Sequence, residues 1–367
     1  MSEGGRILDG VQAFPQLEDA WRALYGRMDW TNPFLSFEWT DAYLRTYGER
    51  RPVLFWIYEV DGAITAIAPL QREGRGIVSL SHPDLNDYCG VLTAAPSTAM
   101  AQALLADLAA ASRGGVRIPL LRDDAPLAAQ LRAQFAARGG NFEIAPHTTN
   151  PLLPIADSLQ AVMAARSKKL RQDVRTTMNH LKRAGSWAYE SSTAGPLAEE
   201  IYDALMQFHL ARQEDKAGHS IFADARNAAF LKQILGRLEP GVSTHMSALR
   251  LNGRIISAAY SLIAGRTLFY WVPSFDASMP SLSLGKLQIA EVIRDALARG
   301  VDCFDFMGGE ESYKFQWTNT AVPIHEWVMY SGILERLSVQ WRRRARDAAK
   351  RAVGRSALLQ RLSARVR

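Results

Sequence analysis

The chain has 367 residues, of which 48% are hydrophobic and 22% are charged, a balance typical of soluble globular proteins. This length predicts about two domains rather than one hydrophobic core. Cys89 and Cys303 are the two cysteines, too few for a disulfide framework, so nothing indicates secretion. We find no apolar run long enough to span a membrane and no signal-peptide pattern, and we therefore expect a cytoplasmic protein.

The net charge of +6 is unevenly distributed along the chain. Residues 335–367 hold 11 Lys and Arg against two acidic residues, so this stretch carries +9 and the remainder carries −3. The basic character therefore belongs to the C-terminal stretch, and it predicts an anionic partner for that stretch alone.

The first half of the chain begins its sheet with two hairpins. Residues 53–81 alternate apolar strands with an Asp61-Gly62 turn and a glycine-rich turn. Asp-Gly between apolar runs is a strong hairpin signal, because both turn positions favour positive φ. A helix over 97–112, a strand over 116–121 and a helix near 125–138 are expected to follow.

A strongly basic helix is expected next, over residues 158–184. Its middle carries the cationic residues Arg166, Lys168, Lys169, Arg171 and Arg175. Two interpretations remain open. The charges form either a solvated face or a clamp for phosphate or carboxylate groups, in which Lys169 and Arg171 are candidate substrate contacts.

The second half repeats the order of elements found in the first. Residues 246–275 form two hairpins, with Asn252-Gly253 as the first turn and Gly265-Arg266 as the second. A helix from about Leu284 to Gly300 and a strand over 301–307 follow. This repetition predicts a tandem pair of similar α/β units with mixed, mostly antiparallel sheets flanked by helices, and a boundary near 151–154.

The expected helix at Leu284 begins with a candidate anion site. A helix N-terminus offers free N–H groups and the positive end of the helix dipole to a phosphate or carboxylate. Ser283 is a candidate cap, Gly285 permits close approach to the backbone, and Lys286 adds charge. The alternative is an ordinary capped helix.

Several stretches, taken in order, resemble a known superfamily. They are NPFLSFEWTDAYLRTYG, AIAPL, LNDYCGVL, SKKLRQDVR, the hairpin LRLNGRIISAAYSLIAGRTLFYWVPSFD, SLGKLQIAEVIRDALARGVDCFDFMGG and ESYKFQW, which together span roughly residues 32–317. The sequence resembles the GNAT acyltransferase superfamily. Within it, the similarity is to the branch shared by cellulose-biosynthesis-associated acetyltransferase-like proteins and Fem-type aminoacyltransferases.

The resemblance implies three segments with different tasks. Residues 1–150 would be an N-terminal GNAT-like domain on the acceptor side, 151–332 a GNAT domain that binds the acyl donor, and 333–367 a basic helical tail. The donor, acyl-CoA, would lie along strand 267–275 at Trp271 and Val272. Its phosphates would meet the helix N-terminus at the residues Ser283, Leu284, Gly285 and Lys286.

The implied function is transfer of an acyl group from acyl-CoA to an amine or hydroxyl of a small-molecule or envelope-related acceptor. The usual acyl-CoA loop pattern of the superfamily has more glycines than PSLSLGK. This departure keeps two alternatives open. One is a Fem-like aminoacyltransferase that uses charged tRNA as its donor, and the other is a GNAT-like binding protein without catalysis.

Acyl transfer requires a base, stabilisation of an oxyanion and a proton donor for the leaving group. The catalytic candidates fall after two strands and are Asp276, Asp305, Glu310, Tyr313 and Lys314. Tyr313 is the best candidate for the proton donor. Asp305 and Glu310 are candidate polarisers of the acceptor. Lys314 is a candidate contact for a phosphate or the oxyanion, and Glu311 is expected to be solvated.

Candidate acceptor contacts are Asp84, Asp87, Tyr88 and His209. Seven histidines without ligand spacing predict no metal site.

The stretch from Ile333 onward predicts a basic amphipathic helix, with Leu334, Leu337 and Trp341 among its apolar positions. Three interpretations remain open. Such a helix binds an anionic membrane surface at the cytoplasmic side, binds RNA phosphates, or packs its apolar stripe on the body of the protein.

Overall fold

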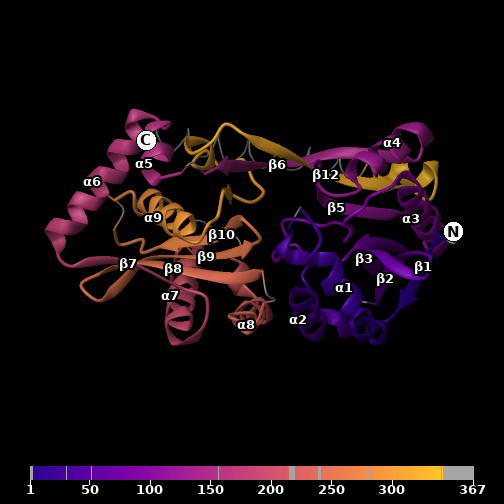
Figure 1. Ribbon diagram of the computed structural model, residues 1–367, viewed down its shortest axis with the longest axis horizontal. Coiled ribbons are helices and arrows are strands. Elements are labelled where there is room, and N and C mark those ends of the chain that lie inside the picture. Colours follow the sequence, from indigo (N-terminus) through magenta and orange to yellow (C-terminus); the bar gives the residue numbers. More distant parts are fainter. Residues whose placement is uncertain are drawn as a thin grey trace, which may run out of the picture.

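We analysed a computed structural model of the chain. It describes residues 3–29, 31–50, 52–155, 157–214, 220–238, 241–279, 282–339 and 341. The two halves of the chain form two lobes that lie side by side (Figure 1). Within the described residues, no helix is both long and apolar enough to cross a membrane.

The first lobe is built from residues of the first half and one later strand. Its strands are β1 (Glu3–Asp9), β2 (Val53–Val60), β3 (Ala63–Glu73), β4 (Gly76–Ser79) and β5 (Val116–Arg122), and its helices are α1 (Glu18–Tyr25), α2 (Phe37–Tyr47), α3 (Thr98–Ala111) and α4 (Ala128–Arg138). Short 3₁₀ helices lie at η1 (Val11–Leu17), η2 (Pro33–Leu35) and η3 (Gly48–Arg50). The expected helix over 97–112 and the strand at 116 are confirmed.

The second lobe follows the long strand β6 (Phe142–Pro154). Its strands are β7 (Trp187–Ser192), β8 (Val242–Leu251), β9 (Arg254–Ala264), β10 (Thr267–Phe275) and β11 (Cys303–Asp305), and its helices are α5 (Leu159–Ala164), α6 (Lys168–Ala184), α7 (Gly195–Glu214), α8 (Ala225–Gln233) and α9 (Leu284–Ala298), with 3₁₀ turns η4 (Ile221–Ala223) and η5 (Lys314–Gln316). The last strand, β12 (Ala321–Met329), returns to the first lobe.

The hairpin turns have the backbone that their residues predict. Asp61 and Gly62 have φ of 49° and 81°, and Asn252 and Gly253 have φ of 50° and 82°. Positive φ at both central residues is the mark of the tight turns that match strand twist. The hairpin β2–β3 and the hairpin β8–β9 therefore correspond, and the predicted repeat is confirmed in the fold.

Among the described residues, twelve strands form one sheet in the order β1-β2-β3-β4-β5-β12-β6-β11-β10-β9-β8-β7. The pairs β4–β5 and β10–β11 are parallel and the other pairs are antiparallel. This mixed, mostly antiparallel arrangement with helices on both faces is the predicted fold class.

Strand β6 connects the lobes, because it pairs with β12 over residues 142–151 and with β11 over residues 152–154. Strand β12 also pairs with β5. The stretch 151–154, where we expected a boundary, is thus strand shared by both lobes, and a strand from the end of the chain completes the sheet of the first lobe. The division of the chain into domains stays a prediction.

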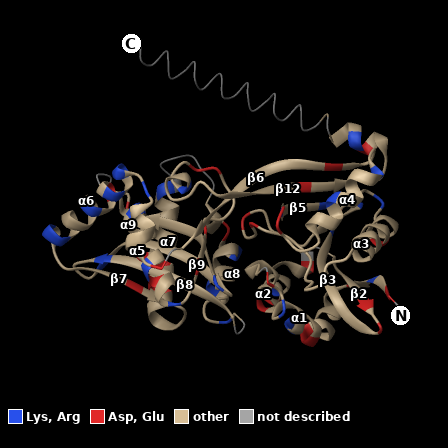
Figure 2. Cartoon of the chain, turned by 45° about the horizontal axis from the view of Figure 1, so that its top comes forward, with Lys and Arg blue, Asp and Glu red and all other residues tan. Residues whose placement is uncertain are grey.

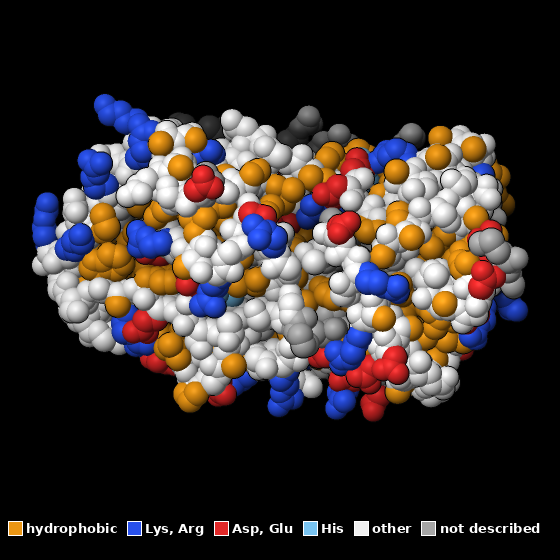
Figure 3. All heavy atoms as spheres, viewed as in Figure 1, with side chains coloured by type: hydrophobic (Ala, Val, Ile, Leu, Met, Phe, Trp, Pro, Cys, Tyr) orange, Lys and Arg blue, Asp and Glu red, His pale blue; other side chains and the backbone are white. Residues whose placement is uncertain are grey.

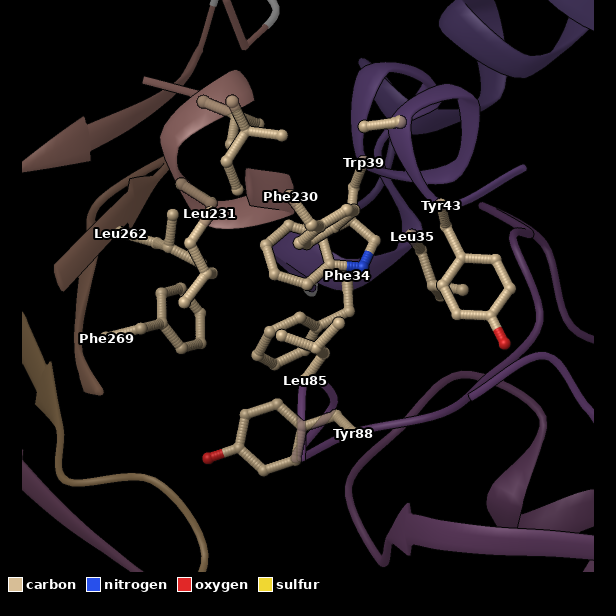
Figure 4. Close-up of a cluster of buried hydrophobic side chains, with 14 of the residues drawn as sticks. Phe34, Leu35, Trp39, Tyr43, Leu85, Tyr88, Phe230, Leu231, Leu262 and Phe269 are labelled. Atoms are coloured by element: carbon tan, nitrogen blue, oxygen red, sulfur yellow. The ribbon is translucent and has the colours of Figure 1, made fainter. Parts of the chain in front are cut away.

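One continuous core crosses the junction between the lobes. Trp39 of the first lobe contacts Phe230 and Trp271 of the second, with ring centroids 5.0 Å and 5.6 Å apart. Figure 4 shows Trp39 and Phe230 side by side, with Phe34 next to them. Tyr47 donates a hydrogen bond of 2.5 Å to Asn227 Oδ1 across the same junction. The junction is therefore packed like a protein interior.

The helix predicted over 158–184 is two helices. Ser167 separates α5 from α6, and its hydroxyl accepts a hydrogen bond from the N–H of Leu170 and caps α6. A serine at this position favours a new helix start over continuation of the old one. Lys and Arg residues recur along α6 (Figure 2), and most of them are exposed.

Candidate active site

The candidate site lies where two neighbouring strands separate. Strands β10 and β11 pair in parallel only from Thr267 to Phe269, opposite residues 303–305. Beyond Phe269, β10 continues to Phe275 without a partner on that side. The separation leaves backbone groups of β10 available to a ligand, because a strand edge exposes unpaired N–H and C=O groups.

A cavity of about 250 Å³ lies at this separation. Its lining comes from β10, the start of α9, α7 and the loop after β11, and consists of Arg212, Tyr270, Pro273, Phe275, Leu282, Ser283, Leu284, Gly285, Lys286, Ile289 and Tyr313. The Tyr270 hydroxyl is buried and has no hydrogen-bond partner among the described residues. Buried polar groups rarely stay unpaired, so this hydroxyl is a candidate ligand contact.

The N-terminus of α9 faces the cavity without a side-chain cap. Ser283 makes no capping hydrogen bond, which corrects the expectation that it caps the helix. Its N–H instead donates to Thr177 Oγ1 of α6 at 3.2 Å. The uncapped end leaves N–H groups of the first turn, and the positive end of the helix dipole, available to an anion that enters the cavity.

Lys286 and Gly285 define the rim of this cavity. The Lys286 ammonium donates to Asp173 Oδ2 of α6 at 2.7 Å, and this contact holds the pKa of Asp173 below its usual range. A Cβ added to Gly285 would meet no neighbour closer than 4.0 Å, at Phe275. Because Gly285 lines the cavity, a side chain at this position would project into it. The other predicted residues of the helix start, Ser283, Leu284 and Lys286, line the same cavity.

A bulge in β10 shifts which residues face the cavity. The pairing with β9 jumps from Tyr270 to Val272, so Trp271 is the extra residue. Trp271 packs into the junction between the lobes, against Phe34 and Trp39, and Val272 belongs to the same core. Trp271 and Val272, the predicted donor contacts, therefore do not line the cavity, whereas Tyr270, Pro273 and Phe275 of β10 do.

The loop after β11 is tightly held. Met307 has φ of 63°, which L-residues rarely adopt, and its N–H donates to Asp305 Oδ1 at 2.7 Å. Lys314 is buried, and its ammonium contacts Gly308 O at 2.8 Å and Glu311 Oε2 at 2.9 Å. Lys314 therefore fixes the loop, and the expectation that Glu311 is only solvated is corrected.

Asp87 of the first lobe faces this loop. Its side chain is half-buried, and burial raises the pKa of the Asp87 carboxyl to about 7, although Lys314 and the backbone N–H of Gly308 both lower it. A carboxylate poised near neutral pH is suited to general base catalysis.

Tyr313 lines the cavity and lies within electrostatic range of Asp87. It lines the cavity with Arg212, and burial raises the pKa of its hydroxyl, with Glu311 and Asp87 adding to the rise and Arg212 opposing it. The hydroxyl is therefore neutral across the physiological range. A neutral phenol that lines a cavity and a carboxylate with a raised pKa are suited to act as an acid and a base.

Asp305 has a different role from the one expected. It is fully buried, and its carboxylate accepts hydrogen bonds from Tyr88 at 2.7 Å, Arg122 at 2.8 Å and Asn150 at 3.0 Å. With the N–H of Met307, four donors surround it. Asp305 and Tyr88 are therefore buried in a hydrogen-bonded cluster between β5, β6 and β11, away from solvent.

Asp276 and Glu310 also lie apart from the cavity. Asp276 accepts from Arg254 at 2.6 Å and from the N–H and hydroxyl of Ser278 at 2.9 Å and 2.7 Å. Although burial opposes it, the net effect of these donors is to lower the pKa of Asp276, which makes it a weak base that stabilises the turn after β10. Glu310 is exposed on the loop.

The remaining predicted contacts are spread over the surroundings. Arg171 donates to the carbonyls of Ala164 and Arg166 and so caps α5, and Lys169 is 83% exposed. His209 Nδ1 lies 2.8 Å from Ser220 Oγ, and burial lowers the pKa of the His209 ring. Asp84 contacts Asn227 at the lobe junction. None of these four lines the cavity.

The equivalent position in the first lobe is filled by the chain itself. Strands β4 and β5 pair in parallel only at Ile77 and Val78. Beyond them, residues 85–92 occupy the gap: Leu92 exchanges two backbone hydrogen bonds with Ile67 of β3, and Cys89 N–H donates to Leu120 O of β5. We call residues 85–92 the plug, and it places Asp87 beside the loop that holds Lys314 and Gly308.

Sequence reasoning missed Tyr270 and Arg212. Tyr270 precedes the bulge, and only the pairing register shows which face it takes. Arg212 is on α7, where its guanidinium lies 4.6 Å from the Phe275 ring centroid. Among the described residues, no cluster of three or more His, Cys, Asp or Glu side chains is arranged to hold a metal ion.

Part of the chain matches the model of a known protein family. Residues 168–315 match the family model described as an acetyltransferase (GNAT) domain. The match begins at α6, contains the cavity and ends just beyond Lys314. The comparison with curated protein sequences gave no match.

Several solved structures share the fold over most of the chain. The C-terminal domain of an Agrobacterium fabrum protein named as a lysylphosphatidylglycerol synthetase is 12% identical, with a TM-score of 0.56 over 89% of this chain and 96% of that one. FemX is 11% identical, with a TM-score of 0.58 over 85% and 96%. L-PGS from Bacillus licheniformis is 12% identical, with a TM-score of 0.52 over 84% and 90%. These likenesses show the fold alone.

Proposed function

We propose that the chain is an acyltransferase that takes its acyl group from a thioester, acyl-CoA, and transfers it to an amine or hydroxyl. The observation that carries this proposal is the cavity at the separation of β10 and β11, with the uncapped N-terminus of α9 at its rim. The GNAT match over residues 168–315 supports it.

The cavity suits a linear thioester arm. Its walls are mostly apolar or aromatic side chains, while polar groups stand at the helix end, at Arg212 and at the buried Tyr270 hydroxyl. In this arrangement the phosphates bind at Leu284, Gly285 and Lys286. The arm then runs along the free edge of β10, and the acyl group ends near Tyr313 and Asp87.

The proposed reaction uses residues from both lobes. The Asp87 carboxylate accepts a proton from the acceptor, whose nitrogen or oxygen attacks the thioester carbonyl carbon. The C–S bond then breaks, and Tyr313 donates its proton to the departing thiolate. Lys314 and Gly308 belong to the loop that faces Asp87, and both limit the rise that burial causes in the pKa of Asp87. Holding both substrates in one geometry supplies much of the rate acceleration in such reactions.

Gly285→Val tests the donor site. We expect no loss of stability, because the position is free of close neighbours and glycine is a poor helix residue. Donor binding should fall at least tenfold, because the valine side chain occupies the cavity. The measurement is thermal stabilisation by acetyl-CoA and longer acyl-CoA esters, where about 2.7 kcal/mol is expected at 100 times the dissociation constant.

Gly332→Val is the matched control, because that glycine also has open space and lies outside the cavity. It should keep full donor binding. If the wild-type protein gains no stability from any CoA ester, or if Gly285→Val binds acyl-CoA as well as wild type, the donor assignment is wrong.

Tyr313→Phe tests the proton donor. We expect kcat to fall about 100-fold with a thioester donor, at the lower end of the usual range for acid catalysis, while donor affinity stays within about threefold. A donor with an already acidic leaving thiol should recover most of the loss, because its thiolate departs without protonation. Equal loss with both donors would indicate a packing role.

A second candidate function uses aminoacyl-tRNA as the donor. The observation in its favour is the outer side of α6, where the exposed cations Lys168, Lys169, Arg171, Arg175, Lys182 and Arg183 follow one another. Lys and Arg gather at this end of the molecule (Figure 3), and α6 touches the cavity rim through Asp173 and Thr177. Binding of charged tRNA without any response to CoA esters would favour this function.

A further inference from the structure

The segment after β12 presents its apolar side chains to solvent. Six large hydrophobic side chains are exposed among the described residues, and four of them lie here: Ile333, Leu334, Leu337 and Trp341, with exposures of 57%, 80%, 55% and 72%. Residues 333–339 are helical. Spacings of three and four residues place the four side chains on one helical face, which we call the apolar stripe.

The contacts of the opposite face determine which side of this helix faces the protein. Glu335 accepts hydrogen bonds from the N–H and hydroxyl of Ser331 at 2.6 Å and 2.8 Å. Glu335 and Val339 line a cavity of about 500 Å³ together with β4, β5 and β12. Arg336 donates to the carbonyl of Gly140. The polar side of the helix therefore faces the protein and the apolar stripe faces outward.

This orientation is the reverse of an ordinary surface helix. An amphipathic helix on a globular protein buries its apolar face in the core and exposes its charges. Over the described residues, the interpretation that the stripe packs on the body is therefore wrong. Concentrated exposed apolar side chains of this kind mark an interaction surface. The helix stands beside the first lobe, at the end of the β12 ribbon (Figure 2).

The sequence that follows the stripe indicates what covers it. Residues 342–367 contain ten Lys and Arg against a single acidic residue, Asp347, and they lie outside the described residues. An apolar stripe joined to a polybasic stretch combines the two signals that together anchor a protein at an anionic lipid surface. A second copy of the chain would instead bring two stretches of the same positive charge together.

We propose that the apolar stripe is a docking element for an anionic lipid bilayer. The stripe enters the interfacial layer, and the positive charge of the sequence that follows it favours an anionic surface. The proposal is independent of the proposed function, because the stripe lies on the lobe without the donor cavity. Docking there leaves the cavity rim in the other lobe uncovered.

Flotation of the full chain with vesicles tests this proposal. The probes are phosphatidylcholine vesicles with and without phosphatidylglycerol. The wild-type protein should bind the anionic vesicles, and Leu334→Gln with Leu337→Gln should lower the vesicle partition coefficient at least tenfold. Replacing Arg342, Arg343 and Arg344 by Gln should weaken binding to anionic vesicles and make it less sensitive to salt.

Val11→Gln is the matched control, because Val11 is an exposed hydrophobic residue far from the stripe in sequence. This variant should bind vesicles like the wild type, and all variants should keep the wild-type melting temperature. The proposal is overturned if the wild-type protein fails to float with anionic vesicles, or if the double variant floats equally well. It is also overturned if the stripe mediates a dimer in sedimentation experiments, or if RNA binds in place of vesicles.

Discussion

Asp87→Asn is expected to lower kcat/KM about 100-fold or more, the usual effect of removing a general base. Asparagine keeps the size of the side chain and an oxygen that accepts from the Gly308 N–H, but it does not take up a proton. In the wild-type protein, kcat/KM should rise with pH and level off above about 7, because burial raises the pKa of Asp87 to about 7. The measurement is the pH dependence of acyl transfer with saturating acceptor.

The same substitution should stabilise the protein at alkaline pH. A carboxyl whose pKa is higher in the folded than in the unfolded state contributes stability below the unfolded pKa, and this contribution is lost as the pH rises through about 7. Asp87→Asn removes that loss. We expect the variant to gain roughly 2 kcal/mol over wild type at pH 8, after allowance for partial exposure, and almost nothing at pH 4.

Asp302→Asn is the control for both measurements. Asp302 is an exposed carboxylate just before β11, paired with Arg266, and its substitution should change neither activity nor the pH dependence of stability. A wild-type pH profile that is flat between 5 and 8 would count against Asp87 as the base. So would an Asp87→Asn variant that is active but no more stable at pH 8.

Asp305→Ala is expected to cost about 3–5 kcal/mol of stability, which is typical of breaking a buried charge pair by removing one partner. The change leaves the buried Arg122 with Asp124 as its remaining carboxylate partner among these contacts, and it removes the acceptor of Tyr88 and Asn150. The measurement is the denaturant midpoint followed by fluorescence and by circular dichroism.

Loss of the Asp305 carboxylate should also affect the junction between the two lobes. The carboxylate joins groups from β5, β6 and the plug at 85–92, so its loss should loosen the contact between the lobes and expose the plug to proteolysis. Asp302→Ala, on the same segment, should cost less than about 1 kcal/mol as an exposed pair. Equal small losses for the two variants would contradict the structural role of Asp305.

Local sequence patterns predicted the elements of the fold well. The Asp-Gly and Asn-Gly turns, the strand 267–275 and the helix starting at Leu284 are found as expected. These features depend on turn chemistry and on helix periodicity, which act over a few residues. Residues 283–286, which were predicted from the start of this helix, line the cavity, because a helix N-terminus is a local feature of the sequence.

Pairing over long distances decided the parts that the sequence did not predict. The insertion of β12 between β5 and β6 joins residues about 200 apart, and no local signal specifies such a partner. The bulge at Trp271 shifts the face of every residue after it, because side chains alternate along a strand. The choice of Tyr270 over Trp271 followed from that register.

The carboxylates Asp305 and Asp87 show what local sequence determined and what only the tertiary structure decided. The amino-acid sequence by itself determined a tandem α/β fold and the start of the helix at Leu284, because turn residues and helix periodicity act locally. Only the tertiary structure decided that Asp305 is buried among four donors, whereas Asp87 lies half-buried by the loop that holds Tyr313. Burial and charge at a carboxyl are set by residues distant in sequence, and these set its pKa.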